Sequence, residues 1–138
     1  MHAMSNTSSF DESSAIRAAL ALFPEIEIAL IFGSFATGRA RPDSDLDIAV
    51  QFPQRMPAEQ CIAMMNALID ATGRVVDLID LRTVGGELFG QIMKPHVKLI
   101  GAEPMMVALR ARYMGHETDW MPYYRKQRDE RLARWMAQ

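Results

Sequence analysis

The sequence has little cysteine, little net charge and no long apolar run. Its one cysteine, Cys61, excludes an intramolecular disulfide framework and fits a reducing compartment, so we expect a cytoplasmic protein. The formal net charge of -2 gives no general signature for binding polyanions, and no direct contact with nucleic acid is expected. No apolar run approaches the roughly 20 residues that a membrane-spanning helix needs, so no membrane association is expected either.

The length and apolar content predict one folded domain with a helical extension. The chain has 138 residues, of which 49% are hydrophobic, and this is enough to form a single core. We expect the polar residues 1–10 to be disordered. Residues 11–101 are predicted to form the folded domain, and residues 102–138 a helical C-terminal extension.

Hydrophobic periodicity predicts an alternation of helices and strands within the folded domain. Strands are expected over 25–32, 45–52, 74–81 and 96–100, and helices over 11–23, 58–71 and 87–93. The predicted fold class is therefore α/β (α+β), with a small mixed sheet of about four strands flanked by helices. The short fourth strand is expected at a sheet edge.

A glycine turn after the first predicted strand is a candidate phosphate-binding element. Gly33 lets the backbone approach a ligand closely. The N–H groups that follow it, together with the Ser34 hydroxyl, can meet a phosphate at a helix N-terminus. Arg39 and Arg41 lie in the next loop, and either can reach a triphosphate, although a solvated loop arginine is the commoner role.

A pair of aspartates opens the second predicted strand. Asp45 and Asp47 are two residues apart, so on a strand both carboxylates leave the same face. Neighbouring carboxylates repel each other unless a cation sits between them. Mg²⁺ commonly takes one or two carboxylates together with substrate phosphates. Taken separately, the Gly33-Ser34 segment could be an ordinary turn and the aspartate pair could belong to a solvated loop. The two segments in this order favour a Mg-nucleotide site.

The third predicted strand contributes one further acid to this site. Asp77 and Asp80 are three residues apart, so a regular strand places them on opposite faces and at most one joins the pair. Asp77 lies within the apolar run, where a buried carboxylate is costly without a partner or a metal. Asp80 lies at the strand end, where a loop can solvate it. We therefore select Asp77, with a structural salt bridge to an arginine as its alternative role.

Together these residues resemble a known family. Gly33-Ser34 followed by Asp45-x-Asp47 resembles the signature of the polymerase-β-like nucleotidyltransferases. The stretches Gly-Ser-Phe-Ala-Thr-Gly and Asp-Ser-Asp-Leu-Asp look most like the minimal nucleotidyltransferases, or MNT proteins, many of which are antitoxins paired with a HEPN-domain ribonuclease. The core motif covers residues 29–50, and a weaker resemblance in order and length continues to about Gly101.

The resemblance implies nucleotidyl transfer from ATP with two Mg²⁺ ions. It implies that Asp45 and Asp47 bind both ions, and that Asp77 binds one and helps deprotonate the acceptor. Gly33 and Ser34 would hold the β and γ phosphates, and we assign Arg39 to the nucleotide as well.

The resemblance also implies an acceptor, which is a tyrosine hydroxyl of a cognate HEPN toxin that AMP transfer would silence. A small-molecule acceptor of the aminoglycoside kind remains an alternative, as does an antitoxin that neutralises by binding alone. The basic, aromatic segment from Trp120 to Trp135 can bind RNA or a protein, or fold back onto the domain. The resemblance favours the toxin as its partner.

Overall fold

The structure, a computed structural model, describes residues 12–116 and 121–137 and is built around a four-stranded mixed sheet. The strand order is β3-β2-β1-β4, and β1 pairs antiparallel with both β2 and β4, whereas β2 and β3 are parallel. This confirms the predicted sheet, including its fourth strand at an edge. The strands are β1 (Ile28–Phe32), β2 (Leu46–Gln51), β3 (Val76–Asp80) and β4 (Val97–Gly101).

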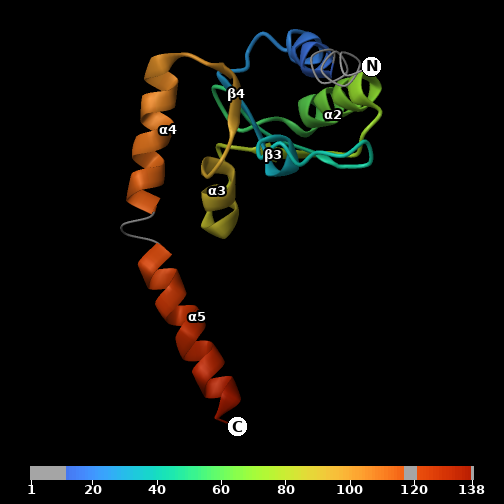
Figure 1. The fold of residues 1–138 in the computed structure, drawn as a ribbon. Coiled ribbons are helices and arrows are strands. Elements are labelled where there is room, and N and C mark those ends of the chain that lie inside the picture. Colours follow the sequence, from blue (N-terminus) through green and yellow to red (C-terminus); the bar gives the residue numbers. More distant parts are fainter. Residues whose placement is uncertain (1–11, 117–120, 138) are drawn as a thin grey trace.

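Helices cover both faces of the sheet, as Figure 1 shows. The N-terminal helix over 12–20 and α2 pack on one face, and α3 and α4 pack on the other. Among the described helices, none is long and apolar enough to cross a membrane. Their bounds are α2 (Ala58–Thr72), α3 (Gly86–Met93), α4 (Glu103–Gly115) and α5 (Met121–Met136), with a single 3-10 turn, η1 (Gly33–Phe35), after β1.

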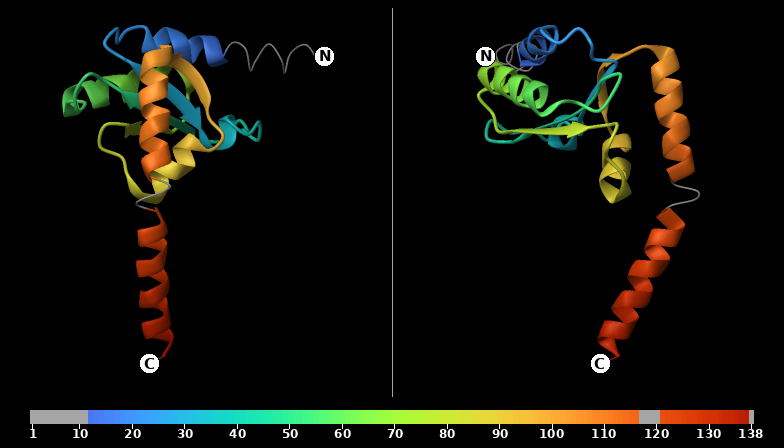
Figure 2. Two further views of the ribbon diagram at one scale, coloured as in Figure 1. Left: turned by 90° about the vertical axis from the view of Figure 1, so that its left-hand side faces the viewer. Right: turned by 180° about the vertical axis from the view of Figure 1, so that it is seen from behind.

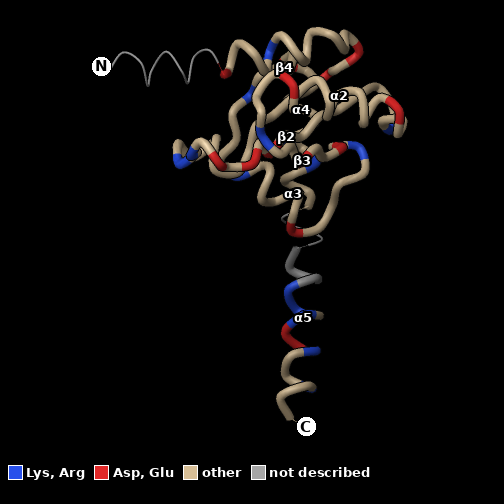
Figure 3. The backbone as a smooth tube through the Cα atoms, turned by 90° about the vertical axis from the view of Figure 1, so that its right-hand side faces the viewer, with Lys and Arg blue, Asp and Glu red and all other residues tan. Residues whose placement is uncertain are grey.

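The last helix, α5, extends away from the sheet and its covering helices (Figure 2). Its described side chains are exposed and mostly charged, and basic residues outnumber acidic ones along it (Figure 3). Arg128 Nη1 lies 3.3 Å from Glu87 Oε1 at the start of α3. Trp135 is 73% exposed, so this aromatic side chain does not fold back into the core. The predicted C-terminal helix is confirmed, whereas the prediction for residues 1–10 lies outside the described residues.

The alternation of side chains along the strands divides the core into two clusters. Leu46, Ile48 and Val50 of β2 pack toward the N-terminal helix and α2. Ala49 packs on the opposite face with residues of α3 and α4. Because strand residues alternate, Asp47 shares the face of Ala49. Every residue of β1 is buried, which fits a strand covered on both sides.

β1, β2 and β3 are shorter than the sequence pattern predicts, and β4 begins and ends one residue later than predicted. β1 begins at Ile28 rather than at residue 25, because the backbone N–H of Ile26 donates to the Phe23 carbonyl in a turn. Ile26 consequently packs with the N-terminal helix and does not share the face of Ile28. In α2 only Met64 and Leu68 are buried, so this helix faces the core along a narrow stripe.

Candidate active site

The glycine turn and the second aspartate of the pair are in direct contact. Phe32, the last residue of β1, pairs with Asp47 of β2, so the turn that starts at Gly33 lies beside the Asp47 side chain. Gly33 has a φ of +72°, and a Cβ atom built there would lie 2.3 Å from Asp47 Oδ2. Both the backbone conformation and the lack of space therefore require glycine. The predicted phosphate-binding turn and the predicted metal-binding acid form one site.

The three predicted acids act on one another electrostatically. Asp47 and Asp77 are register partners on the parallel strands β2 and β3, so their side chains lie side by side on one face. Asp45 lies immediately before β2. The pKa of Asp47 is raised above its usual 3.8, first by burial, then by the negative charge of Asp77, and then by that of Asp45. A perturbed carboxylate beside two others is typical of a functional site.

Asp77 lies beside Asp47, but the prediction that it is buried is wrong. Its side chain is exposed on β3, an edge strand of the sheet. No ion pair joins Asp77 to an arginine among the side chains of 12–116 and 125–137, so the alternative salt bridge is not seen there. Its exposure leaves the carboxylate accessible to a second substrate.

Asp80 has a structural role on the other face of β3. Its Oδ2 accepts a hydrogen bond from the backbone N–H of Met56 at 3.0 Å, and its Oδ1 accepts one from that of Arg82 at 2.9 Å. These bonds hold the loops at the end of the strand. Asp77 and Asp80 therefore point to opposite faces of β3, as their spacing in the sequence predicts. Asp77 is the candidate catalytic acid, and Asp80 is structural.

The carboxylates fit Mg²⁺ by their chemistry, although they are not a preassembled cage. Within the parts of the chain that the structure describes, no three His, Cys, Asp or Glu side chains form a ready metal-ligand group. Mg²⁺ does not need one, because it usually binds through one or two carboxylates and takes its other ligands from water and phosphates. Asp45, Asp47 and Asp77 are the residues that could hold the metal.

The hydrogen bonds that close the turn after β1 are donated by residues from Ala36 onward. The carbonyl of Gly33 accepts hydrogen bonds from Ala36 N at 3.1 Å and Thr37 N at 3.3 Å, and that of Ser34 accepts one from Arg39 N at 2.9 Å. The first N–H groups of a helical turn have no acceptor within the turn, so they can bind an anion. The side chain of Arg39 is exposed on the loop that follows.

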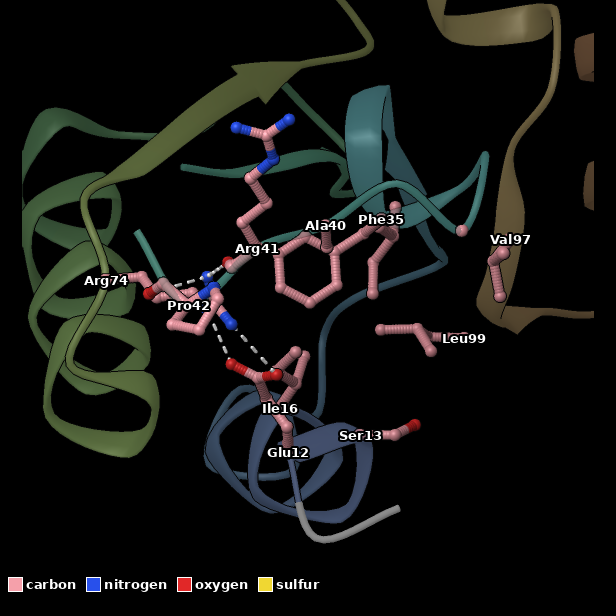
Figure 4. A pocket seen from close by; sticks show the side chains of 12 residues that line it. Glu12, Ser13, Ile16, Phe35, Ala40, Arg41, Pro42, Arg74, Val97 and Leu99 are labelled. Atoms are coloured by element: carbon pink, nitrogen blue, oxygen red, sulfur yellow. Dashed lines mark hydrogen bonds and ion pairs between the residues drawn. The ribbon is translucent and has the colours of Figure 1, made fainter. Parts of the chain in front are cut away.

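A cavity of about 600 Å³ lies on the opposite side of this loop from Asp47. Its lining comes from the N-terminal helix, the loop after η1 and the edge strand β4, as Figure 4 shows. Ile31 contributes to the lining, and it points to the face of β1 opposite to Phe32, the register partner of Asp47. The cavity is therefore separate from the acids. One of its lining residues, Arg74, contacts the loop that leads to Asp45, and sequence reasoning assigned it no role.

Comparisons with known proteins agree with this geometry. The family model described as polymerase beta, nucleotidyltransferase matches residues 14–104. A solved structure described as a minimal nucleotidyltransferase is 30% identical, with a TM-score of 0.54, over 62% of this chain and 90% of that one. No curated protein matches.

Two toxin–antitoxin crystal structures share the fold over most of the chain. One, which contains AMP-PNP, is 24% identical with a TM-score of 0.69, over 88% of this chain and 93% of that one. The other is a tri-AMPylated HEPN toxin of Shewanella oneidensis in complex with an MNT antitoxin. It is 21% identical with a TM-score of 0.66, over 91% of this chain and 93% of that one.

Proposed function

The chain belongs to the polymerase beta nucleotidyltransferase family, and we propose that it is an MNT-type antitoxin that transfers AMP from ATP to a tyrosine hydroxyl of a cognate HEPN ribonuclease toxin. The observation that carries this proposal is the contact between the Gly33 turn and Asp47, with Asp77 and Asp45 around the same carboxylate. The AMP-PNP of one fold relative and the AMPylated toxin of another support the choice of donor and acceptor.

The residues of the site divide the tasks of the proposed reaction among them. Asp45 and Asp47 would hold two Mg²⁺ ions, and Asp77 would bind one of them. Backbone N–H groups at Gly33 and Ser34 bind the β and γ phosphates, and Arg39 pairs with the triphosphate. The bound ions supply the positive charge that stabilises the attacking and leaving oxygens.

The proposed step transfers one group and one proton. The tyrosine oxygen forms a bond to the α-phosphorus of ATP, the bond from that phosphorus to the bridging oxygen breaks, and pyrophosphate leaves. Asp77 takes the proton of the tyrosine hydroxyl, and its exposure allows a side chain of another protein to approach. AMP bound through that oxygen silences the toxin.

A neutralising contact without chemistry is a weaker account of these residues. Binding alone would not require a glycine with a φ of +72° pressed against a carboxylate whose pKa is raised by two others. Such repulsion is destabilising unless it serves a ligand. AMP transfer to a small molecule would use the same site residues. A neighbouring reading frame that encodes a HEPN protein would favour the toxin over a small molecule as the acceptor.

Intact-mass spectrometry of the cognate toxin tests the proposal. The toxin is incubated with ATP, Mg²⁺ and either the wild-type chain or the Asp45→Ala/Asp47→Ala double variant. We expect a mass gain in whole AMP units with the wild type only. Neutralisation by both proteins without a mass gain would reject catalysis and favour binding alone. Neither neutralisation nor a mass gain would point to a small-molecule acceptor.

A further inference from the structure

Arg74, between α2 and β3, is bonded through its whole guanidinium group (Figure 4). Its Nη1 lies 2.6 Å from the carbonyl oxygen of Arg41, 2.8 Å from that of Ser44 and 3.1 Å from that of Pro42. Its Nε and Nη2 face the Glu12 carboxylate in an ion pair. The side chain of Arg74 is only 11% exposed, so these partners replace most of its water.

The same guanidinium also contacts the glycine turn. Its carbon lies 4.7 Å from the centre of the Phe35 ring, in a cation–π contact. Phe35 directly follows Ser34 in η1, and Ser44 directly precedes Asp45. One side chain therefore contacts both ends of the loop between the proposed phosphate-binding turn and the first proposed metal ligand.

The loop near Asp45 forms its own turn, which Arg74 attaches to the domain. Arg41 N donates to Ser44 Oγ at 2.8 Å, and Ser44 N donates to the Arg41 carbonyl at 3.0 Å. These bonds form the turn without Arg74. Because these bonds close the turn, Arg74 is not needed for the local conformation of the turn. Arg74 instead determines where the turn lies relative to the sheet.

We propose that Arg74 is a positioning residue that places Asp45 and the Gly33 turn correctly relative to each other for binding the Mg-nucleotide. This inference rests on the proposed function of that site. A guanidinium is suited to this task, because its planar group can donate hydrogen bonds to a carboxylate on one edge and to carbonyls on another. A lysine ammonium is a compact point charge and cannot span both sets of acceptors. Groups that orient metal ligands in this way typically contribute about 10- to 100-fold to metal affinity or activity.

Arg82 offers a matched control at the other end of β3. Its Nη2 lies 2.9 Å from Glu27 Oε1, and its Nε donates to the Phe52 carbonyl at 2.7 Å. It is likewise an arginine bound to a carboxylate and to backbone, but it does not contact the loop between Gly33 and Asp45. Loss of this guanidinium perturbs the fold without reaching the proposed site.

The test compares Arg74→Lys with Arg82→Lys by two measurements. Hydrogen exchange follows the backbone amides of residues 39–41 and 43–45, and calorimetric titration gives the affinity for Mg-AMP-PNP. We expect Arg74→Lys to speed exchange in this loop and to weaken Mg-AMP-PNP binding by about 10- to 100-fold. Arg82→Lys should change neither, even where it lowers the unfolding midpoint. If Arg74→Lys fails to fold, Glu12→Gln, which keeps the guanidinium, should move both readouts in the same direction.

Two results would overturn the inference. One is an Arg74→Lys protein that binds Mg-AMP-PNP as tightly as the wild type, whether or not its loop exchanges faster. The other is an equal loss of affinity in Arg74→Lys and Arg82→Lys. If the wild type itself does not bind Mg-AMP-PNP, the proposed function fails, and the exchange measurement alone then decides whether Arg74 holds the loop.

Discussion

Replacement of Gly33 by alanine should separate stability from activity. A φ of +72° costs alanine about 1–2 kcal/mol, so the free energy of unfolding should fall by about that amount. The new Cβ would meet Asp47 Oδ2 at 2.3 Å, whereas ordinary contact begins near 3.4 Å, so the carboxylate must retreat by about 1 Å. That oxygen is the end of a short side chain, and its movement adds little to the loss of stability.

The same movement should be costly for the reaction. A misplacement of about 1 Å in a reacting group can lower the rate by about 100-fold. This corresponds to about 2.7 kcal/mol in the activation free energy, because each tenfold change in rate is about 1.4 kcal/mol. We therefore expect AMP transfer by Gly33→Ala to fall by about two orders of magnitude, in a protein that remains folded at room temperature.

Gly38→Ala is the control for this prediction. Gly38 has the same φ of +72°, and a Cβ there meets nothing within 4 Å. Urea denaturation should show similar losses of unfolding free energy for the two variants. Single-turnover transfer assays should show a large loss for Gly33→Ala and little change for Gly38→Ala. Equal rates in the two variants would refute the inference that the space beside Asp47 matters for the reaction.

Further predictions concern the acids and the metal. The pKa of Asp47 is raised in the folded protein, so ionisation of this carboxylate is less favourable there than in the unfolded chain. Stability should therefore fall as the pH rises from 3.8 through the raised pKa. Asp47→Asn should lose this pH dependence. In thermal melts with EDTA at neutral pH, that variant should have a higher unfolding midpoint than the wild type; a lower midpoint would contradict the assigned repulsion. Asp77→Asn should abolish transfer without lowering stability, because it removes a charge that repels Asp47. Asp80→Asn should cost about 1–3 kcal/mol in urea denaturation and keep transfer, because it weakens the bonds to Met56 and Arg82. EDTA should stop transfer by the wild type and added Mg²⁺ should restore it; transfer that persists in EDTA would argue against metal dependence.

The sequence motif predicted that the glycine turn and the aspartate pair face one another, because their order and spacing along the chain determine this. Gly33 directly follows one strand and Asp47 belongs to the next, and antiparallel pairing of the two successive strands brings them together. The position of Asp77 depends on how β3 pairs with β2, which the sequence does not display. Its selection was supported by an expected burial that is wrong, and by a face assignment that is correct. The roles of these residues stay predictions.

The contribution of Arg74 could not be found from the sequence. Its acceptors in the loop are backbone carbonyls, which every residue carries and which therefore leave no residue signature. The partner carboxylate, Glu12, lies far away along the chain, and only the packing of the N-terminal helix brings it close. Contacts of this kind depend on the assembled fold.

The most direct test of nucleotidyl transfer is the fate of the two labelled ends of ATP. The cognate toxin is incubated with this protein, Mg²⁺ and ATP that carries a radioactive phosphorus at either the α or the γ position. We predict that the α label becomes covalently bound to the toxin while the γ label leaves as pyrophosphate. A γ label on the toxin, or no label from either position, would contradict the account.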